Sequence, residues 1–114
     1  MRPDRLYLQD IVASADSVAT FLAGVGKDRF VDDDLLRSAV LHKLTVIGEA
    51  GARISAETRA RSPSIPWVDM VGFRNIVVHA YFGVDWGITW ATAMKDLPVL
   101  RAAVSEMLAS LPGE

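Results

Sequence analysis

Apolar residues recur at intervals of three and four along most of the chain, the spacing that places side chains on one face of an α-helix. The first such run covers residues 8–22, and Gly24 and Gly26 follow it as terminators. A second helix is expected from about residue 35 to about residue 59, where apolar and small residues share a face: Leu36, Val40, Leu44, Ile47, Gly51 and Ile54.

Residues 27–34 lie between these two helices and are expected to form a connection that ends in three aspartates. A calcium loop needs alternating ligands with a glycine and a distal glutamate. A carboxylate at the start of a helix instead accepts hydrogen bonds from backbone N–H groups. The aspartates are therefore predicted to cap the second helix.

The second helix contains two glycines, Gly48 and Gly51, each of which costs about 1 kcal/mol relative to alanine in a helix interior. Close approach of another helix is the expected compensation. Glu49 lies within this small-residue segment, where its carboxylate could reach a neighbouring helix and orient an Arg or a His. His42, with no carboxylate three or four residues away, is expected to be exposed or capping.

Two prolines in residues 62–66 predict a turn that stops the second helix. A third helix is expected over about residues 67–80, opened by Pro66 and stopped by Gly83. Asp85 can then cap a fourth helix.

The fourth helix carries apolar residues from Trp86 to Leu111 but contains Pro98. It is expected to kink or divide there, with Asp96 restarting it as a new cap. Strand-like alternation and internal repeats are absent from the pattern. The predicted fold class is all-α, an up-and-down bundle of four to five helices whose last helix is kinked or broken near Pro98.

Composition narrows the function classes. The chain has 114 residues, which suits one domain spanning residues 1–114, and 51% of them are hydrophobic. The lack of cysteine excludes disulfides and thiolate chemistry. Apolar runs are too short for a membrane span, and we expect a cytoplasmic protein. The formal net charge of −2 means that binding of nucleic acid would need a local concentration of positive charge.

Residues 72–83 place four chemically capable side chains in an otherwise apolar stretch: Arg74, Asn75, His79 and Tyr81. On a helical wheel, Arg74 and Tyr81 share the stripe that is expected to point into the bundle. Asn75 and His79 lie together on the next face. Because the third helix has almost no polar side, we expect it to be buried all round by a second copy of the chain, as a homodimer.

A buried Arg74 needs a carboxylate partner or a polar cleft, because an unpaired charge in an apolar site costs several kcal/mol. One interpretation is purely structural: an internal pair between Arg74 and Glu49, with His79 satisfied in the core. The other is catalytic. A guanidinium holds a phosphate with two parallel hydrogen bonds, and a histidine exchanges protons with a ribose 2′-hydroxyl or a leaving 5′-oxygen, which is metal-independent RNA cleavage.

Arg74-Asn75, three further residues and then His79-Ala80-Tyr81-Phe82-Gly83-Val84-Asp85 closely resemble the motif of the HepT-like toxins of the HEPN superfamily. The resemblance extends along the chain in the same order. It includes Ala39-Val40-Leu41, Val46-Ile47-Gly48-Glu49-Ala50, Ile65-Pro66-Trp67 and Asp96-Leu97-Pro98.

The resemblance implies a HEPN-type bundle that forms a homodimer, with two motifs facing each other in a cleft that cleaves RNA without metal. It implies a toxin–antitoxin pair of the type VII kind, in which an MntA-like nucleotidyltransferase neutralises the toxin by transferring AMP to the motif tyrosine. Carried across, Arg74 would bind the phosphate, His79 would act as general acid or base, Asn75 would hydrogen-bond, and Tyr81 would accept AMP. Glu49 is a supporting candidate.

A competing interpretation is a non-catalytic HEPN-type module that binds a nucleotide or its nucleotidyltransferase partner in the same cleft. A metal site within the bundle is the least favoured interpretation, because two histidines without a Glu-x-x-His pair supply too few ligands. No metal and no cofactor are expected.

Overall fold

The computed structural model describes residues 2–80 and 85–111, and for residues 77–80 it describes the backbone alone. Every regular element in this part of the chain is helical. The elements are α1 (Asp4–Phe21), α2 (Lys27–Asp32), α3 (Asp34–Ala52), α4 (Ala56–Ala60), α5 (Trp67–Ala80), α6 (Trp86–Ala91), the π-helical segment η1 (Thr92–Asp96) and α7 (Leu97–Ser110). The predicted all-α class is confirmed.

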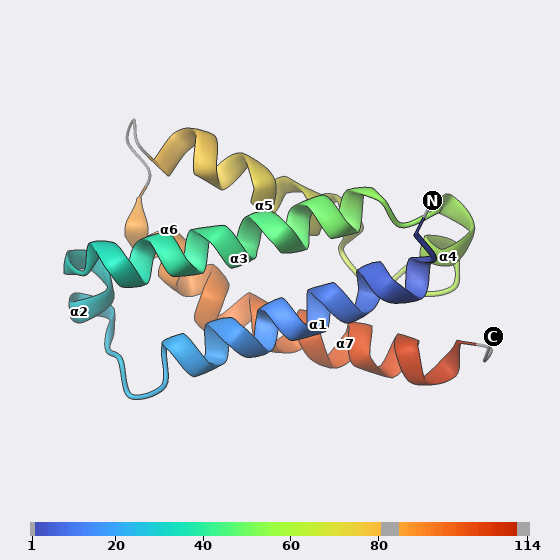
Figure 1. The fold of residues 1–114 in the computed structure, drawn as a ribbon, viewed down its shortest axis with the longest axis horizontal. Coiled ribbons are helices and arrows are strands. Elements are labelled where there is room, and N and C mark those ends of the chain that lie inside the picture. Colours follow the sequence, from blue (N-terminus) through green and yellow to red (C-terminus); the bar gives the residue numbers. More distant parts are fainter. Residues whose placement is uncertain (1, 81–84, 112–114) are drawn as a thin grey trace.

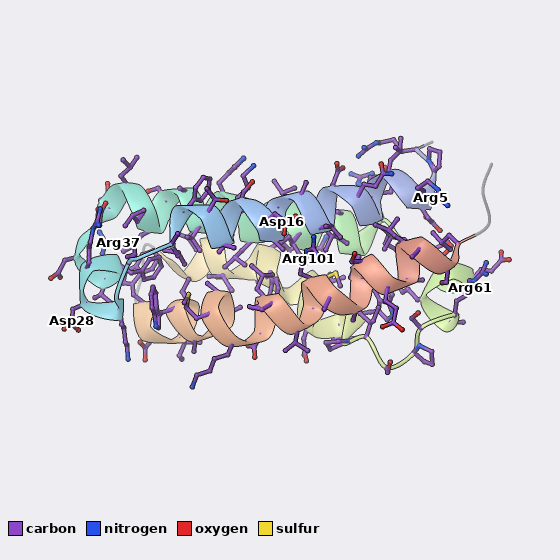
Figure 2. The ribbon with its side chains drawn as sticks, turned by 90° about the horizontal axis from the view of Figure 1, so that it is seen from below. Arg5, Asp16, Asp28, Arg37, Arg61 and Arg101 are labelled. Carbon is purple, nitrogen blue, oxygen red and sulfur yellow. The ribbon has the colours of Figure 1, made fainter. Side chains whose placement is uncertain are left out.

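The long helices run up and down along one axis, and α3 is central among them (Figure 1). It packs against α1 on one side and α5 on the other, and α1 also packs against α7. The short helices α2 and α4 lie at opposite ends of the bundle. A side-chain link between α1 and α7 is visible in Figure 2, where Arg101 Nε donates to Asp16 Oδ1 at 2.9 Å.

The core is built from the apolar stripes that the spacing predicts. Its fully buried side chains come from all the long helices and from α2: Leu8, Ile11, Val18, Phe30, Val40, Leu44, Ile47, Met70, Leu97 and Val104. Within the described residues, no helix is both long enough and apolar enough to cross a membrane.

The predicted extent of the second helix, residues 35–59, is wrong at its end. Helix α3 stops at Ala52, and a separate short helix, α4, begins after Ser55. The Ser55 hydroxyl caps α4 by accepting from Thr58 N at 3.2 Å, and it donates to Asp4 of α1 at 2.6 Å. Leaving the helix also buries Ile54 in the core. These tertiary contacts outweigh continuation of the helix.

Residues 27–34 are more than a connection, because they contain α2. Phe30 explains this turn of helix: it is fully buried and its ring lies 5.4 Å from that of Trp90 and 6.3 Å from that of Trp86. Aromatic pairs at such spacings contribute beyond the area they bury. The predicted aspartate cap is confirmed, since Asp33 Oδ1 accepts from Leu36 N at 3.1 Å.

The predicted interruption near Pro98 is confirmed and takes the form of η1 between α6 and α7. A π-helical turn shifts the hydrogen-bond register, which accommodates the missing N–H of a proline. The prediction that Asp96 restarts the helix as a cap is wrong. Asp96 keeps helical backbone angles and its side chain makes no capping hydrogen bond, because the chain never leaves the helical conformation there. Asp85 does cap α6, accepting from Gly87 N at 2.8 Å.

Candidate functional site

The site is built where α5 crosses α3. A Cβ atom on Gly48 would lie 2.6 Å from the backbone nitrogen of Arg74, and one on Gly51 would lie 2.9 Å from Met70 Sδ. Real Cβ atoms do not approach backbone atoms this closely. The expected close approach at the two glycines is confirmed, and it sets the position of Arg74 relative to α3.

Arg74 pairs with Glu49, whose Oε1 lies 3.8 Å from Arg74 Nη1. The predicted carboxylate partner is therefore present, but the pair is not internal. The Arg74 side chain is 41% exposed and that of Glu49 is 52% exposed. The prediction that Arg74 points into the bundle is wrong. Its backbone rests on Gly48, and from there the long side chain leaves along the surface of α3.

The buried and exposed faces of α5 differ from those that the helical wheel predicts. Trp67 and Met70 are buried as predicted. Beyond them, the half-buried Phe73 and Ile76 pack against the core, and the exposed Asn75 follows Arg74. Val68 is 82% exposed. Within this chain α5 thus has a solvated side, and the all-round burial that the composition predicts would need a second molecule.

His79 belongs to the last turn of α5, five residues beyond Arg74, which is about 7.5 Å along a helix axis. Its side chain and all of Tyr81 lie outside the described residues, as does Gly83. The shared face of Asn75 and His79 and the inward direction of Tyr81 stay predictions. The structure brings together Arg74 and Glu49, and Asn75 is exposed on the same helix as Arg74.

A groove that the sequence motifs did not indicate lies between α1 and α3, directly beside this pair. It measures about 250 Å³, and Glu49 forms part of its wall together with Arg2, Tyr7, Asp10, His42, Thr45, Val46, Ala50 and Arg53. The helical spacing of His42, Glu49 and Arg53 was a usable signal, because positions seven and four residues apart share a face. His42 is exposed, as expected.

A second hollow, of about 370 Å³, separates the first half of α5 from η1 and α7. Its walls are mainly apolar and include Met70, Phe73, Val99 and Leu100. Across the part of the chain that the structure describes, no three His, Cys, Asp or Glu side chains come close enough together to hold a metal ion.

Comparison with known proteins gives one consistent result. The model of a family described as "Ribonuclease HepT-like" matches residues 11–107. A protein of Methanocaldococcus jannaschii named as a putative RNase is 36% identical over 90% of this chain and 94% of its own length. One from Thermococcus cleftensis named "Probable ribonuclease HepT" is 32% identical over 93% of this chain and 96% of its own. No solved structure is significantly similar to the chain.

Proposed function

Because the chain belongs to the HepT-like ribonuclease family, we propose that it is a metal-independent endoribonuclease whose catalytic groups are Arg74, Asn75 and His79. The observation that carries the proposal is the family match, which spans the whole motif region. The accessibility of Arg74 supports it. A guanidinium at the surface of the bundle is within reach of an RNA phosphate, whereas a buried one would not be.

The proposed reaction is attack of a ribose 2′-oxygen on the adjacent phosphorus. An imidazole removes the 2′-hydroxyl proton, the new O–P bond forms, and the bond to the 5′-oxygen breaks as that oxygen takes up a proton. The products are a 2′,3′-cyclic phosphate and a free 5′-hydroxyl. His79 supplies the acid–base group, Arg74 stabilises charge on the phosphate oxygens, and Asn75 hydrogen-bonds to substrate or to His79.

Glu49 fits this reaction as a residue that positions Arg74. Pairs between exposed side chains contribute only about 0–1 kcal/mol. A phosphate, which accepts two parallel hydrogen bonds from a guanidinium, can therefore displace the carboxylate at little cost. Glu49 would hold Arg74 over Gly48 until substrate arrives.

A homodimer through α5 completes the proposal. Along one helix Arg74 and His79 point about 140° apart, so two copies would assemble a cleft more readily than one. As a toxin of a type VII-like toxin–antitoxin pair, the protein would be neutralised when a nucleotidyltransferase transfers AMP to Tyr81, because a bulky anionic adduct would block an anion-binding cleft.

The activity is tested with purified protein and single-stranded RNA in the presence of EDTA. Wild type should release fragments with cyclic phosphate ends, and His79→Ala and Arg74→Ala should each lower the rate by at least about 100-fold. The variants should keep the helical circular dichroism of wild type. Cleavage that persists in both variants, or that needs added metal, would refute the mechanism. Binding without any cleavage would instead favour the non-catalytic module.

The regulation is tested by intact mass. After incubation with the cognate nucleotidyltransferase and ATP, wild type should gain whole AMP units and lose its activity. Tyr81→Phe should gain none and stay active. A mass increase that persists in Tyr81→Phe would place the modification elsewhere.

A further inference from the structure

Glu49 links Arg74 to the groove between α1 and α3, because it both lines the groove and pairs with Arg74. The groove runs along the outer surface of α3, on the side of that helix nearest α1. Polymer bound at Arg74 and extending over α3 would therefore enter it.

Charge is distributed unevenly along this path. Arg2 is neutralised by Asp10, with Nη1 and Oδ2 2.7 Å apart, and Arg74 by Glu49. Arg53 is different: within the described part of the chain its guanidinium makes no hydrogen bond, ion pair or ring contact. Three guanidinium groups thus meet two carboxylates here, and the path carries net positive charge in a molecule whose formal net charge is −2. The excess is one charge and lies at Arg53, where a phosphate could bind without displacing a carboxylate.

The polar groups follow α3 in a line. His42, Glu49 and Arg53 are two turns and one turn apart, so His42 and Arg53 are separated by about 16 Å along the helix. His42 is exposed and offers a ring N–H, and Thr45 lies between. His42, Thr45 and Arg53 can donate to phosphate oxygens, whereas Glu49 between them is an acceptor that pairs with Arg74. Donors spread over this length can contact more than one nucleotide of a single strand.

We propose that this groove binds the phosphates of single-stranded RNA that flank the cleaved one, with Arg53 as its principal phosphate contact and His42 as a second donor. The inference rests on the proposed ribonuclease function, since it places the scissile phosphate at Arg74. It assigns to Arg53 a role in holding the strand and none in the chemical step.

Binding is measured by fluorescence anisotropy with a labelled single-stranded RNA that carries 2′-O-methyl groups throughout, which removes the attacking hydroxyl. Arg53→Gln should weaken binding about 10-fold near 0.1 M salt. It should also make the dependence of log affinity on log salt shallower by about 0.7, the change for one lost phosphate contact on a single strand. A merely structural role would not move this slope.

Arg61→Gln is the matched control. Arg61 is an exposed arginine that follows α4 at one end of the molecule and does not line the groove (Figure 2). The affinity of Arg61→Gln for the RNA, and the slope of its salt dependence, should equal those of wild type. With cleavable RNA of about ten nucleotides, Arg53→Gln should raise KM and leave kcat unchanged.

The possible results test the groove assignment and the ribonuclease proposal independently. If wild type cleaves RNA and Arg53→Gln binds with unchanged affinity and slope, or Arg61→Gln weakens binding equally, the groove assignment is wrong and the ribonuclease stands. If binding depends on Arg53 but neither wild type nor any variant cleaves RNA, the groove assignment is supported and the ribonuclease proposal is refuted. A wild type that binds no single-stranded RNA overturns the groove, and the cleavage assay then decides the activity independently.

Discussion

The pair of Arg74 and Glu49 is predicted correctly from the sequence, but its degree of burial is not. The residue types and the apolar surroundings indicate a buried pair, which would be costly to open. Both side chains are instead about half exposed. An exposed pair holds a guanidinium in place without making it unavailable, which is what a phosphate-binding residue needs.

Asp4, in the first turn of α1, joins distant parts of the chain by accepting hydrogen bonds from Ser55 and Thr58. Burial alone would raise the pKa of its carboxyl, but hydrogen bonds from the Ser55 hydroxyl and amide and from the Thr58 hydroxyl outweigh burial and lower the pKa. A carboxyl whose pKa is depressed by folding stabilises the folded state above its unfolded pKa of about 3.9. That stabilisation is lost as the pH falls through the folded-state pKa.

Asp4→Asn should therefore lower the free energy of unfolding by about 1 kcal/mol at pH 7, and the difference from wild type should be smaller at pH 3, below the unfolded pKa of about 3.9. Urea denaturation at both pH values measures it. Asp28→Asn, at an exposed position of α2, should change stability by no more than a few tenths of a kcal/mol. A loss in Asp4→Asn that is the same at pH 7 and pH 3 would show that the charge is not responsible.

At the scale of elements, the crossing of α3 and α5 is controlled by two glycines with different neighbours. The obstacle at Gly48 is the backbone of Arg74, which cannot move without moving α5. The obstacle at Gly51 is the sulfur of Met70, the adaptable part of a flexible side chain. The same substitution should therefore be more costly at Gly48 than at Gly51.

Gly48→Ala should lower the free energy of unfolding by up to about 2 kcal/mol, because overpacking costs about 1–3 kcal/mol and the gain in helix propensity returns about 1 kcal/mol. It should also reduce RNA cleavage, since α5 shifts at Arg74. Gly51→Ala should be neutral or slightly stabilising, with wild-type cleavage. Thermal denaturation and the cleavage assay measure both, and equal effects of the two substitutions would contradict this account of the crossing.

At the scale of the whole molecule, one side of α5 exposes apolar surface that no other part of the described chain covers. Among the described residues, the extensive packing of α5 is against α3, while an apolar hollow separates its first half from α7. Val68 and Val99, on α5 and α7, are 82% and 71% exposed. Exposed apolar surface of this kind is typical of an interaction site.

We expect wild type to sediment as a dimer at micromolar concentration, and Val68→Asp to sediment as a monomer with reduced cleavage, because a buried unpaired carboxylate is costly. Leu35→Asp is the matched control: Leu35 is 77% exposed at the start of α3 and belongs to neither α5 nor α7, and the variant should stay dimeric. A wild type that is monomeric under these conditions would remove the shared cleft from the proposal.

The periodicity of the sequence was sufficient for the helix class, the bounds of α5, the aspartate caps of α3 and α6 and the break near Pro98, because each depends on residues within one or two turns of each other. The glycines at 48 and 51 also predicted a close approach. Tertiary contacts decided the rest. Helix α3 ends at Ala52 because Ile54 enters the core and Ser55 binds Asp4, and α2 forms because the Phe30 ring packs against two tryptophans.

For residues 72–83, the sequence by itself determined which chemical groups are present and which family carries them in that order. It could not determine that Arg74 faces outward, because a helical wheel gives relative directions and only packing sets where the core lies. The rotation of α5 on Gly48 set that direction. It placed Arg74 against Glu49, which lines the same groove as Arg53, the C-cap residue of α3.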